Sequence, residues 1–415
     1  MRLDTVGPLV LGLAVIVVLA WLFGALARRL GQPAVIGEIL AGILLGPSLF
    51  GGALTRTLFP ADVRPWLALL ANIGVAVFMF LVGMEFDRDL LRGQARMATG
   101  VSLSAIMLPF ALGALLALYL IGHHPTGHRL AFVLFIGTAM SVTAFPVLAR
   151  ILTDRGMIDT PIGGLALACA AVGDVLAWAL LAVVGALAGA ATEPWQVLLI
   201  VPFTAVLLGV VRPLLARLAA RYPAGGRLSG VGVLLAVSVG LLLCAQATER
   251  MGLHLIFGAF LFGVAMPRAG APVIRDQVLP WIRRICSVLL LPVFFMTASL
   301  AVDLSTMDAV AFGELALILL VAIAGKFLGA FVGSYFHGVR ARPSAVLAVL
   351  LNTRGLTELV ALTVGLQLGV LPPDLFSLMV VMALVTTAMT GVLLKFVHPE
   401  ERVRRDVRPA LGVRS

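Results

Sequence analysis

The sequence predicts an all-α polytopic membrane protein with about thirteen transmembrane helices. Charged residues make up only 12% of the 415 residues, against roughly 25% in soluble domains. The mean hydropathy is +1.10, and apolar runs long enough to span a bilayer recur between breaks rich in Gly, Pro and Arg. Segments about 216 residues apart also resemble each other. We therefore expect a chain that lies in a membrane and is built from two related halves.

The apolar runs place the helices in order along the chain. The first run has no small-residue cleavage site after it, so it is expected to be a true span rather than a signal peptide. The ninth run is short and is expected to be broken or tilted. The expected helices are 8–28, 34–50, 66–86, 98–121, 130–152, 163–189, 196–220, 229–247, 253–266, 285–301, 309–335, 344–370 and 374–397.

The distribution of Lys and Arg predicts the orientation of these helices. Twenty-three of the 30 basic residues follow odd-numbered helices, two lie within helices, and the remaining five share a side with the N-terminus. By the positive-inside rule, the N-terminus is expected outside the cell and the C-terminus in the cytoplasm. The membrane is expected to be the inner or plasma membrane. The net charge of +10 is then expected to come from basic residues on the cytoplasmic face, next to anionic lipid, rather than from a nucleic-acid site.

The internal similarity predicts an inverted repeat. FMFLVGMEFD at 78–87 aligns with FFMTASLAVD at 294–303, and SVTAFPVLARIL at 141–152 aligns with the helix that carries Arg354. Seven helices separate each matched pair, and because seven is odd the two copies must cross the membrane in opposite directions. This is the organisation of many secondary transporters that work by alternating access. The predicted parts are 1–195 (helices 1–6), a linker helix in 196–228, 229–397 (helices 8–13) and a short basic tail, 398–415.

Two helices carry signs of a break at matching depth. In the first copy Pro146 removes an internal hydrogen bond, and Ser141 and Thr143 supply hydroxyls that can satisfy freed backbone groups or coordinate a cation. In the second copy Asn352 precedes Gly355, which permits unwinding. Two interrupted helices at corresponding positions predict a binding site near the midplane of the membrane.

Four charged residues lie within membrane-length apolar segments, where they persist only along a polar pathway or in pairs. Asp174 follows the first break by one helix, and its carboxylate can hold either a cation or a proton. Lys326 is its expected partner, with a structural ion pair as the alternative. Arg354 and Glu358 are one helical turn apart and could simply pair with each other. We interpret Asp174 as the ion and proton site.

Three stretches, SVTAFPVLARIL, VGDVLAW and LNTRGLTELV, resemble signatures of the monovalent cation:proton antiporter superfamily. The chain is most similar to its second branch, which includes bacterial Kef- and Nap-type antiporters and plant cation/proton exchangers. The resemblance implies the sodium/proton antiporter fold with two crossing discontinuous helices, a homodimer and no cofactor. It also implies that Asp174 is the essential ion-binding aspartate and that Thr143 is the threonine of the first unwound segment. Lys326 would be the basic residue of the helix before the second broken helix. Arg354 and Glu358 would belong to the motif of that second broken helix.

The chain departs from the family pattern at two places. Gly173 stands where the family usually has Asn, Asp or Gln, which favours one proton per cation, although a titrating Lys326 leaves this open. After Phe396 no GxGxxG motif follows, so regulation by a nucleotide-binding domain is not expected.

These observations predict an antiporter that exchanges Na⁺ or K⁺ for H⁺ by alternating access, with both ions competing at Asp174. The alternative is an ion-coupled carrier of an organic solute on the same fold. An enzyme is not expected: intramembrane aspartyl proteases need G-x-G-D, and position 171 is Ala171 rather than Gly. A channel is disfavoured because no filter-like repeated loop is present.

Overall fold

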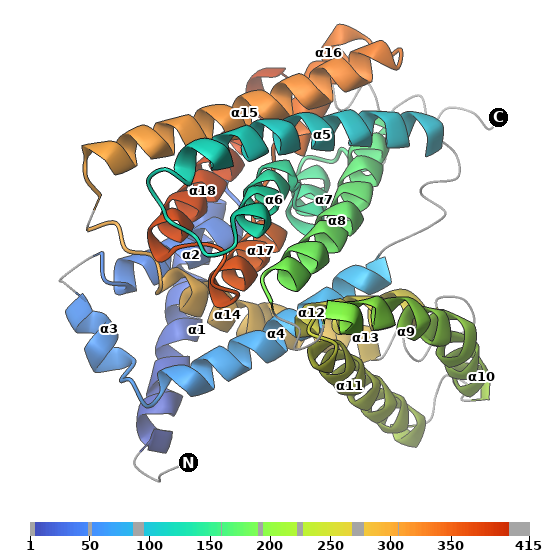
Figure 1. Cartoon of the computed structure of the whole chain (residues 1–415). Coiled ribbons are helices and arrows are strands. Elements are labelled where there is room, and N and C mark those ends of the chain that lie inside the picture. The colour runs from blue at the N-terminus through green and yellow to red at the C-terminus, as the bar shows by residue number, and fades with distance from the viewer. Residues whose placement is uncertain are drawn as a thin grey trace. The chain divides into compact units, whose positions relative to one another are not determined.

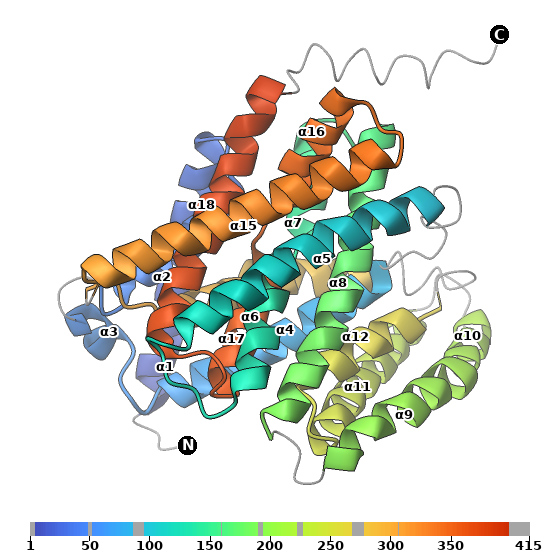
Figure 2. The ribbon, with the colours of Figure 1, turned by 45° about the horizontal axis from the view of Figure 1, so that its top comes forward.

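The structure is a computed structural model, and it describes residues 5–48, 52–85, 95–158, 160–189, 194–221, 227–267, 278–305 and 307–397. Within these ranges every regular element is a helix (Figures 1 and 2). The predicted basic tail, 398–415, lies outside the described residues. The helices are α1 Val6–Arg29, α2 Ala34–Leu45, α3 Ala53–Leu58, α4 Arg64–Glu85, α5 Ala95–Leu120, α6 Arg129–Ser141, α7 Phe145–Asp154, α8 Pro161–Leu187, α9 Ile200–Val206, α10 Arg212–Arg221, α11 Arg227–Arg250, α12 Leu255–Ala265, α13 Leu279–Ile285, α14 Leu291–Ser299, α15 Ala309–Phe336, α16 Ala341–Leu351, α17 Leu356–Gln367 and α18 Pro373–Val397.

The membrane spans follow the order of the predicted helices, but fewer of them qualify as full spans than the thirteen expected. Over the described ranges, ten helical segments are long and apolar enough to cross a membrane, and α16 and α17 form one further span bent by 45°. Two shorter apolar helices, α2 and α12, complete the set. Helix α2 ends at Leu45 rather than near residue 50 because Gly46 and Pro47 follow, and proline cannot continue a helix without losing a hydrogen bond. The all-helical polytopic prediction is confirmed.

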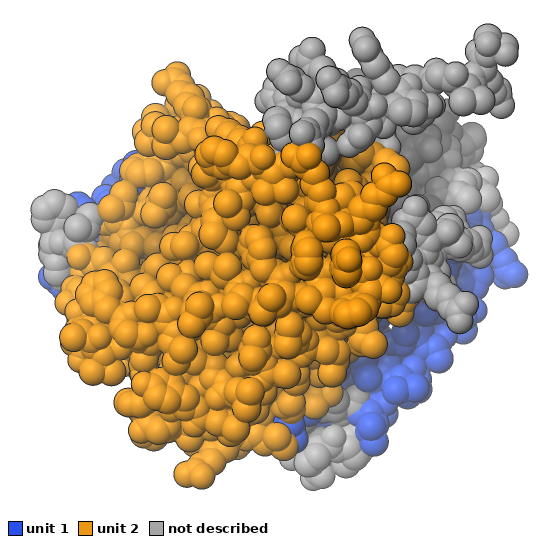
Figure 3. Space-filling model, turned by 90° about the horizontal axis from the view of Figure 1, so that it is seen from above, with its two compact units in different colours: residues 1–19, 54–87, 185–297 blue, residues 20–53, 88–184, 298–415 orange. Residues whose placement is uncertain are grey.

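The chain divides into two compact units, which Figure 3 distinguishes by colour. Unit 1 comprises 1–19, 54–87 and 185–297, and unit 2 comprises 20–53, 88–184 and 298–415. In unit 1, α4 packs along α12, and α12 packs on α11. In unit 2, α15 packs along α5, which also packs on α6, and α18 contacts α15, α16 and α17. The inverted repeat, in which 1–195 and 229–397 cross the membrane in opposite directions, stays a prediction.

Close packing of α15 on α5 in unit 2 depends on three glycines one turn apart. Gly325, Gly329 and Gly333 all lie against α5. A Cβ atom on Gly329 would lie 2.7 Å from the carbonyl oxygen of Ser104. Small residues at this spacing let membrane helices approach closely. The approach brings Lys326, next to the first of these glycines, into the interior of the unit.

Candidate functional site

The first broken span consists of α6 and α7. Helix α6 ends at Ser141, three residues without regular structure follow, and α7 begins at Phe145. Pro146 lies in the first turn of α7, where its missing N–H would have no helical partner in any case. It therefore favours the start of the new helix after the break.

The second broken span consists of α16 and α17, separated by Asn352–Gly355. Gly355 has φ +150° and ψ −119°, a conformation that side chains rarely tolerate. A Cβ on Gly355 would also lie 2.9 Å from Cγ2 of Val147 in α7. Glycine is therefore required at this position, both for the backbone conformation and for the close approach of α7.

The two breaks contact each other directly. The amide of Ala144 donates to the carbonyl of Thr353 at 3.0 Å. The hydroxyl of Thr143 donates to the carbonyl of Leu351 at 2.9 Å. Each break thus satisfies backbone groups that the other leaves free, which is how irregular backbone is tolerated at membrane depth.

Arg354 and Glu358 form a fully buried ion pair. Nη1 of Arg354 lies 2.8 and 2.7 Å from the two carboxylate oxygens of Glu358. The same guanidinium donates to the carbonyl of Ala139 at 2.6 Å and to that of Met140 at 2.7 Å. Both carbonyls belong to the last turn of α6, so the pair holds the end of that helix. This geometry matches the pairing that the four-residue spacing predicted.

Lys326 reaches the first break from α15. Its ammonium donates to the hydroxyl of Thr143 at 2.8 Å, to the carbonyl of Ser141, and to the carbonyl of Ala105 at 3.4 Å. Asp174 is not among these hydrogen-bond partners. The predicted pairing of the two side chains is therefore an electrostatic interaction across the site rather than a direct hydrogen bond.

Asp174 lies in the middle of α8 and is 3% exposed. Its carboxylate interacts with the backbone amide of Phe145, at the N-terminus of α7, and with the charge of Lys326. Neither carboxylate oxygen has a hydrogen-bond partner of standard geometry. The positive end of a helix dipole favours negative charge, and a buried carboxylate without bonded partners is costly. Such a group is suited to binding a cation or a proton.

A small cavity of about 10 Å³ adjoins Asp174. Its lining comes from α6, α8 and α17 and from Val142 in the first break, and two of its members are threonines that the sequence reasoning did not select, Thr138 and Thr357. Thr357 lies within the stretch LNTRGLTELV, and Thr138 lies three residues before SVTAFPVLARIL. Many threonines in membrane helices simply bond to their own helix, so nothing in the sequence singles out these two.

All nine residues predicted from the sequence lie in unit 2 at or beside the crossing of the two broken spans. Ser141 and Thr143 are placed there with hydroxyls already engaged: Ser141 donates to the carbonyl of Thr138 at 2.8 Å. The side chain of Asn352 has no hydrogen-bond partner although it is fully buried. The structure shows that the nine residues lie close together, and their roles in transport stay predictions.

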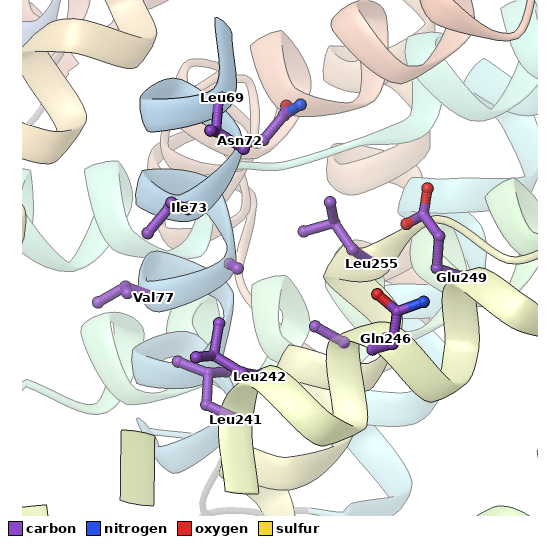
Figure 4. Close-up of a pocket in the computed structure, with 11 residues that line it drawn as sticks. Leu69, Asn72, Ile73, Val77, Leu241, Leu242, Gln246, Glu249 and Leu255 are labelled. Carbon is purple, nitrogen blue, oxygen red and sulfur yellow. The ribbon is translucent and has the colours of Figure 1, made fainter. Parts of the chain in front are cut away.

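A larger cavity, of about 400 Å³, lies within unit 1 between α4 and the helices α11 and α12 (Figure 4). Asn72, Gln246 and Glu249 are the polar members of a lining that is otherwise apolar, and Figure 4 draws Gln246 and Glu249 on neighbouring turns of one helix. The only carboxylate there, Glu249, is exposed. The cavity therefore lacks the buried charge and the interrupted helices that distinguish the site around Asp174.

Comparison with known proteins agrees with this geometry. The family described as "Sodium/hydrogen exchanger, transmembrane" matches residues 14–398. The chain is 39% identical to the Na⁺/H⁺ antiporter NhaS4 of Synechocystis over 96% of this chain and 99% of that protein. It is 37% identical to cation/H⁺ antiporter 17 of Arabidopsis thaliana over 94% of this chain, and 31% identical to K⁺/H⁺ antiporter 1 of Saccharomyces cerevisiae over 92%. The chain spans about half the length of these plant and yeast relatives (48% and 45%).

Among solved structures, the chain resembles the sodium proton antiporter MjNhaP1 of Methanocaldococcus jannaschii. The TM-score is 0.64 at 16% sequence identity, and the match covers 92% of this chain and 94% of the other. At this identity the likeness concerns the fold alone.

Proposed function

Because the chain belongs to the transmembrane sodium/hydrogen exchanger family, a family of transporters and not of enzymes, we propose that it exchanges Na⁺ or K⁺ for H⁺ across a cell membrane, with the two ions competing at Asp174. The relatives named above are antiporters of Na⁺, of K⁺ or of cations in general. The chain is thus a monovalent cation/proton antiporter, and the choice of ion and the mechanism at Asp174 are the proposal.

One observation carries the mechanism. The carboxylate of Asp174 is buried at the crossing of two broken spans, and neither of its oxygens has a standard hydrogen-bond partner. A carboxylate in this setting needs a positive partner, and a cation and a proton can each supply one. They cannot both do so, because the proton removes the charge that attracts the cation. Exclusive binding of the two ions, combined with alternating access, gives exchange.

The surroundings of Asp174 favour a small ion over an organic solute. The adjoining cavity is about 10 Å³, whereas sites for organic ligands are usually of the order of 300 Å³ or more. A carrier of an organic solute remains the rival function, and it requires a much larger polar lining in another conformation of the protein.

The test is proton flux in proteoliposomes containing a lumenal pH dye, with Na⁺, K⁺, Li⁺ or choline added outside. We expect an alkali cation to drive proton movement through the wild-type protein and Asp174→Asn to abolish it, because Asn cannot exchange a proton. Both proteins should give the same elution profile in detergent, which controls for folding. Retained pH-dependent exchange in Asp174→Asn would refute the assignment. No response of folded wild-type protein to any alkali cation would favour the organic-solute carrier.

Further features belong to the same proposal. The excess of Lys and Arg on one side supports an N-terminus outside and a C-terminus in the cytoplasm of the inner or plasma membrane. Gly173, beside Asp174, supports one proton per cation, with Lys326 as the group that could add a second. A homodimer with no cofactor is proposed from the family alone.

A further inference from the structure

We propose that the transported cation binds on the α17 side of Asp174, where the hydroxyl oxygens of Thr357 and Thr138 join the carboxylate as ligands. The inference rests on the proposed exchange function and makes it more specific, since it names the ligands and excludes the Ser141 and Thr143 hydroxyls that the sequence favoured.

The surroundings of Asp174 differ between two sides. On one side lies the ammonium of Lys326, bonded to the carbonyl of Ser141 and the hydroxyl of Thr143. On the other side lies the cavity lined by Thr138, Thr357 and apolar groups. Within the described lining of this cavity, Asp174 is the one ionisable side chain.

The side that holds Lys326 is unfavourable for a second positive ion. Two positive charges a few ångströms apart repel each other strongly where little water screens them. The oxygens there are also engaged, because the hydroxyl of Thr143 accepts from Lys326 and donates to the carbonyl of Leu351. A cation that used Thr143 would have to displace the ammonium first.

Thr357 has the features expected of an unused ligand. It is the second residue of α17, it is 1% exposed, and its hydroxyl has no hydrogen-bond partner. A buried hydroxyl without a hydrogen-bond partner is destabilising, so its presence in a native protein calls for an explanation. The same residue lines the cavity beside the unpaired carboxylate oxygens of Asp174. A cation between them would satisfy all three oxygens.

Thr138 can contribute from α6. Its hydroxyl hydrogen is directed to the carbonyl of Leu134 at 2.7 Å, which leaves the lone pairs of the oxygen available to a cation. Its own carbonyl is not available in the same way, because it accepts from the hydroxyl of Ser141 and from the amide of Val142. The side chain is therefore the ligand that this residue can offer.

The size and lining of the cavity explain why protein oxygens are needed. About 10 Å³ is close to the least that holds one water molecule, so a cation enters with little of its hydration shell. The remaining walls are Val142, Ala177, Trp178, Leu181 and Ala361, which supply no carboxylate or hydroxyl oxygen. Replacement of water by fixed oxygens is the way proteins bind alkali cations, and the side-chain oxygens in the described lining are those of Asp174 and the two threonines.

The test compares Thr357→Val with Thr357→Ser in the proteoliposome assay. Valine keeps the shape of threonine and removes the oxygen, so we expect the half-saturating concentration of Na⁺ or K⁺ to rise about tenfold to a hundredfold, the range for losing one bond to a charged group. Serine restores the oxygen and should return the value to within about threefold of wild type, an allowance of under 1 kcal/mol. Thr363→Val is the matched control: it lies on the same helix, its hydroxyl donates to the carbonyl of Leu359, and it should change nothing.

The outcomes separate this inference from the proposed function. If wild type exchanges ions but Thr357→Val keeps its half-saturating concentration, the placement of the cation is overturned while the exchange function stands. A rise that serine does not reverse also overturns it, because a packing defect would act in that way. Should Thr357→Val fail to fold, Thr138→Val is predicted to raise the same concentration, and stabilisation of the detergent-purified protein by added cation gives a second reading of affinity. An unchanged value there overturns the inference equally.

Discussion

The two broken spans differ in the donors that bond to the carbonyls at the end of their first helix. The last four carbonyls of a helix lack helical partners, and both α6 and α16 end inside unit 2. At the end of α6, the final three carbonyls accept from Arg354 twice and from Lys326 once. At the end of α16, the final four accept from the amides of Asn352 and Thr353 and from hydroxyls of Thr390 and Thr143.

This difference separates the charged from the neutral end of the site. A helix C-terminus carries partial negative charge, so two cationic side chains at α6 gain both hydrogen bonds and dipole interaction. The end of α16 receives no charged donor among its described contacts, and the residues that follow it lead to Thr357 and the cavity. The fixed positive charges of Arg354 and Lys326 are thus held at the end of α6, whereas the end of α16 is completed by neutral donors.

The largest loss of stability should follow from removing Arg354, the charged donor to the end of α6. Arg354→Met leaves Glu358 buried without its partner and frees the carbonyls of Ala139 and Met140. Removing one member of a buried ion pair costs about 3–5 kcal/mol. We expect the thermal unfolding midpoint in detergent to fall strongly, or the protein to be lost during purification.

The double variant Arg354→Met/Glu358→Leu sharpens this prediction. It removes the uncompensated carboxylate as well, so it should recover a large part of the lost stability. The loss of stability that remains measures the cost of leaving the carbonyls of Ala139 and Met140 without a donor. If the double variant is no more stable than Arg354→Met, the ion pair does not account for the effect.

An intermediate effect is expected at Lys326. Lys326→Met removes a charge whose direct partners are neutral oxygens, so no buried carboxylate loses a bonded partner, and a loss of about 1–3 kcal/mol is expected. Because Lys326 interacts electrostatically with Asp174, the pH optimum of exchange should move more than the half-saturating cation concentration changes. Exchange rate measured against pH tests this, with Lys326→Arg as the charge-preserving control. An unchanged pH profile would make Lys326 a purely structural residue.

The smallest effect should arise at the neutral end. The hydroxyl of Thr387 in α18 lies 2.6 Å from the carbonyl of Arg354 and 2.7 Å from that of Ala383. Thr387→Val removes this donor at nearly constant volume, and hydrogen bonds within membrane proteins average about 0.6 kcal/mol. The control is Thr297→Val, whose hydroxyl donates within its own helix. A loss at Thr387 as large as that at Arg354 would contradict the distinction between the two ends.

The sequence predicted the positions of the breaks because their causes are local. Pro146 favours a new helix start, and Gly355 allows a conformation closed to other residues. The pairing of Arg354 with Glu358 follows from their four-residue separation. Membrane burial of Asp174 was predictable from the apolar residues on either side of it. These features depend on short stretches of chain.

The arrangement of donors around the breaks depends on the tertiary fold and could not be predicted. Lys326 was expected to pair with Asp174, but its hydrogen bonds go to Ser141 and Thr143. Nothing in the sequence distinguishes Thr357, with its free hydroxyl, from Thr363, which bonds within its helix. The two compact units could not be read from the sequence either, because each collects separate chain segments.

The donors that complete the end of α6 have a consequence for biosynthesis. Arg354 lies 215 and 214 residues after the carbonyls that it satisfies. At about 5–20 residues per second, a ribosome needs roughly 10–40 s to synthesise that interval. For this time the first broken span exists without its partners, and bare carbonyls are not stable in lipid. Water, the insertion machinery or a chaperone must therefore protect the end of α6 until the second half of the chain arrives.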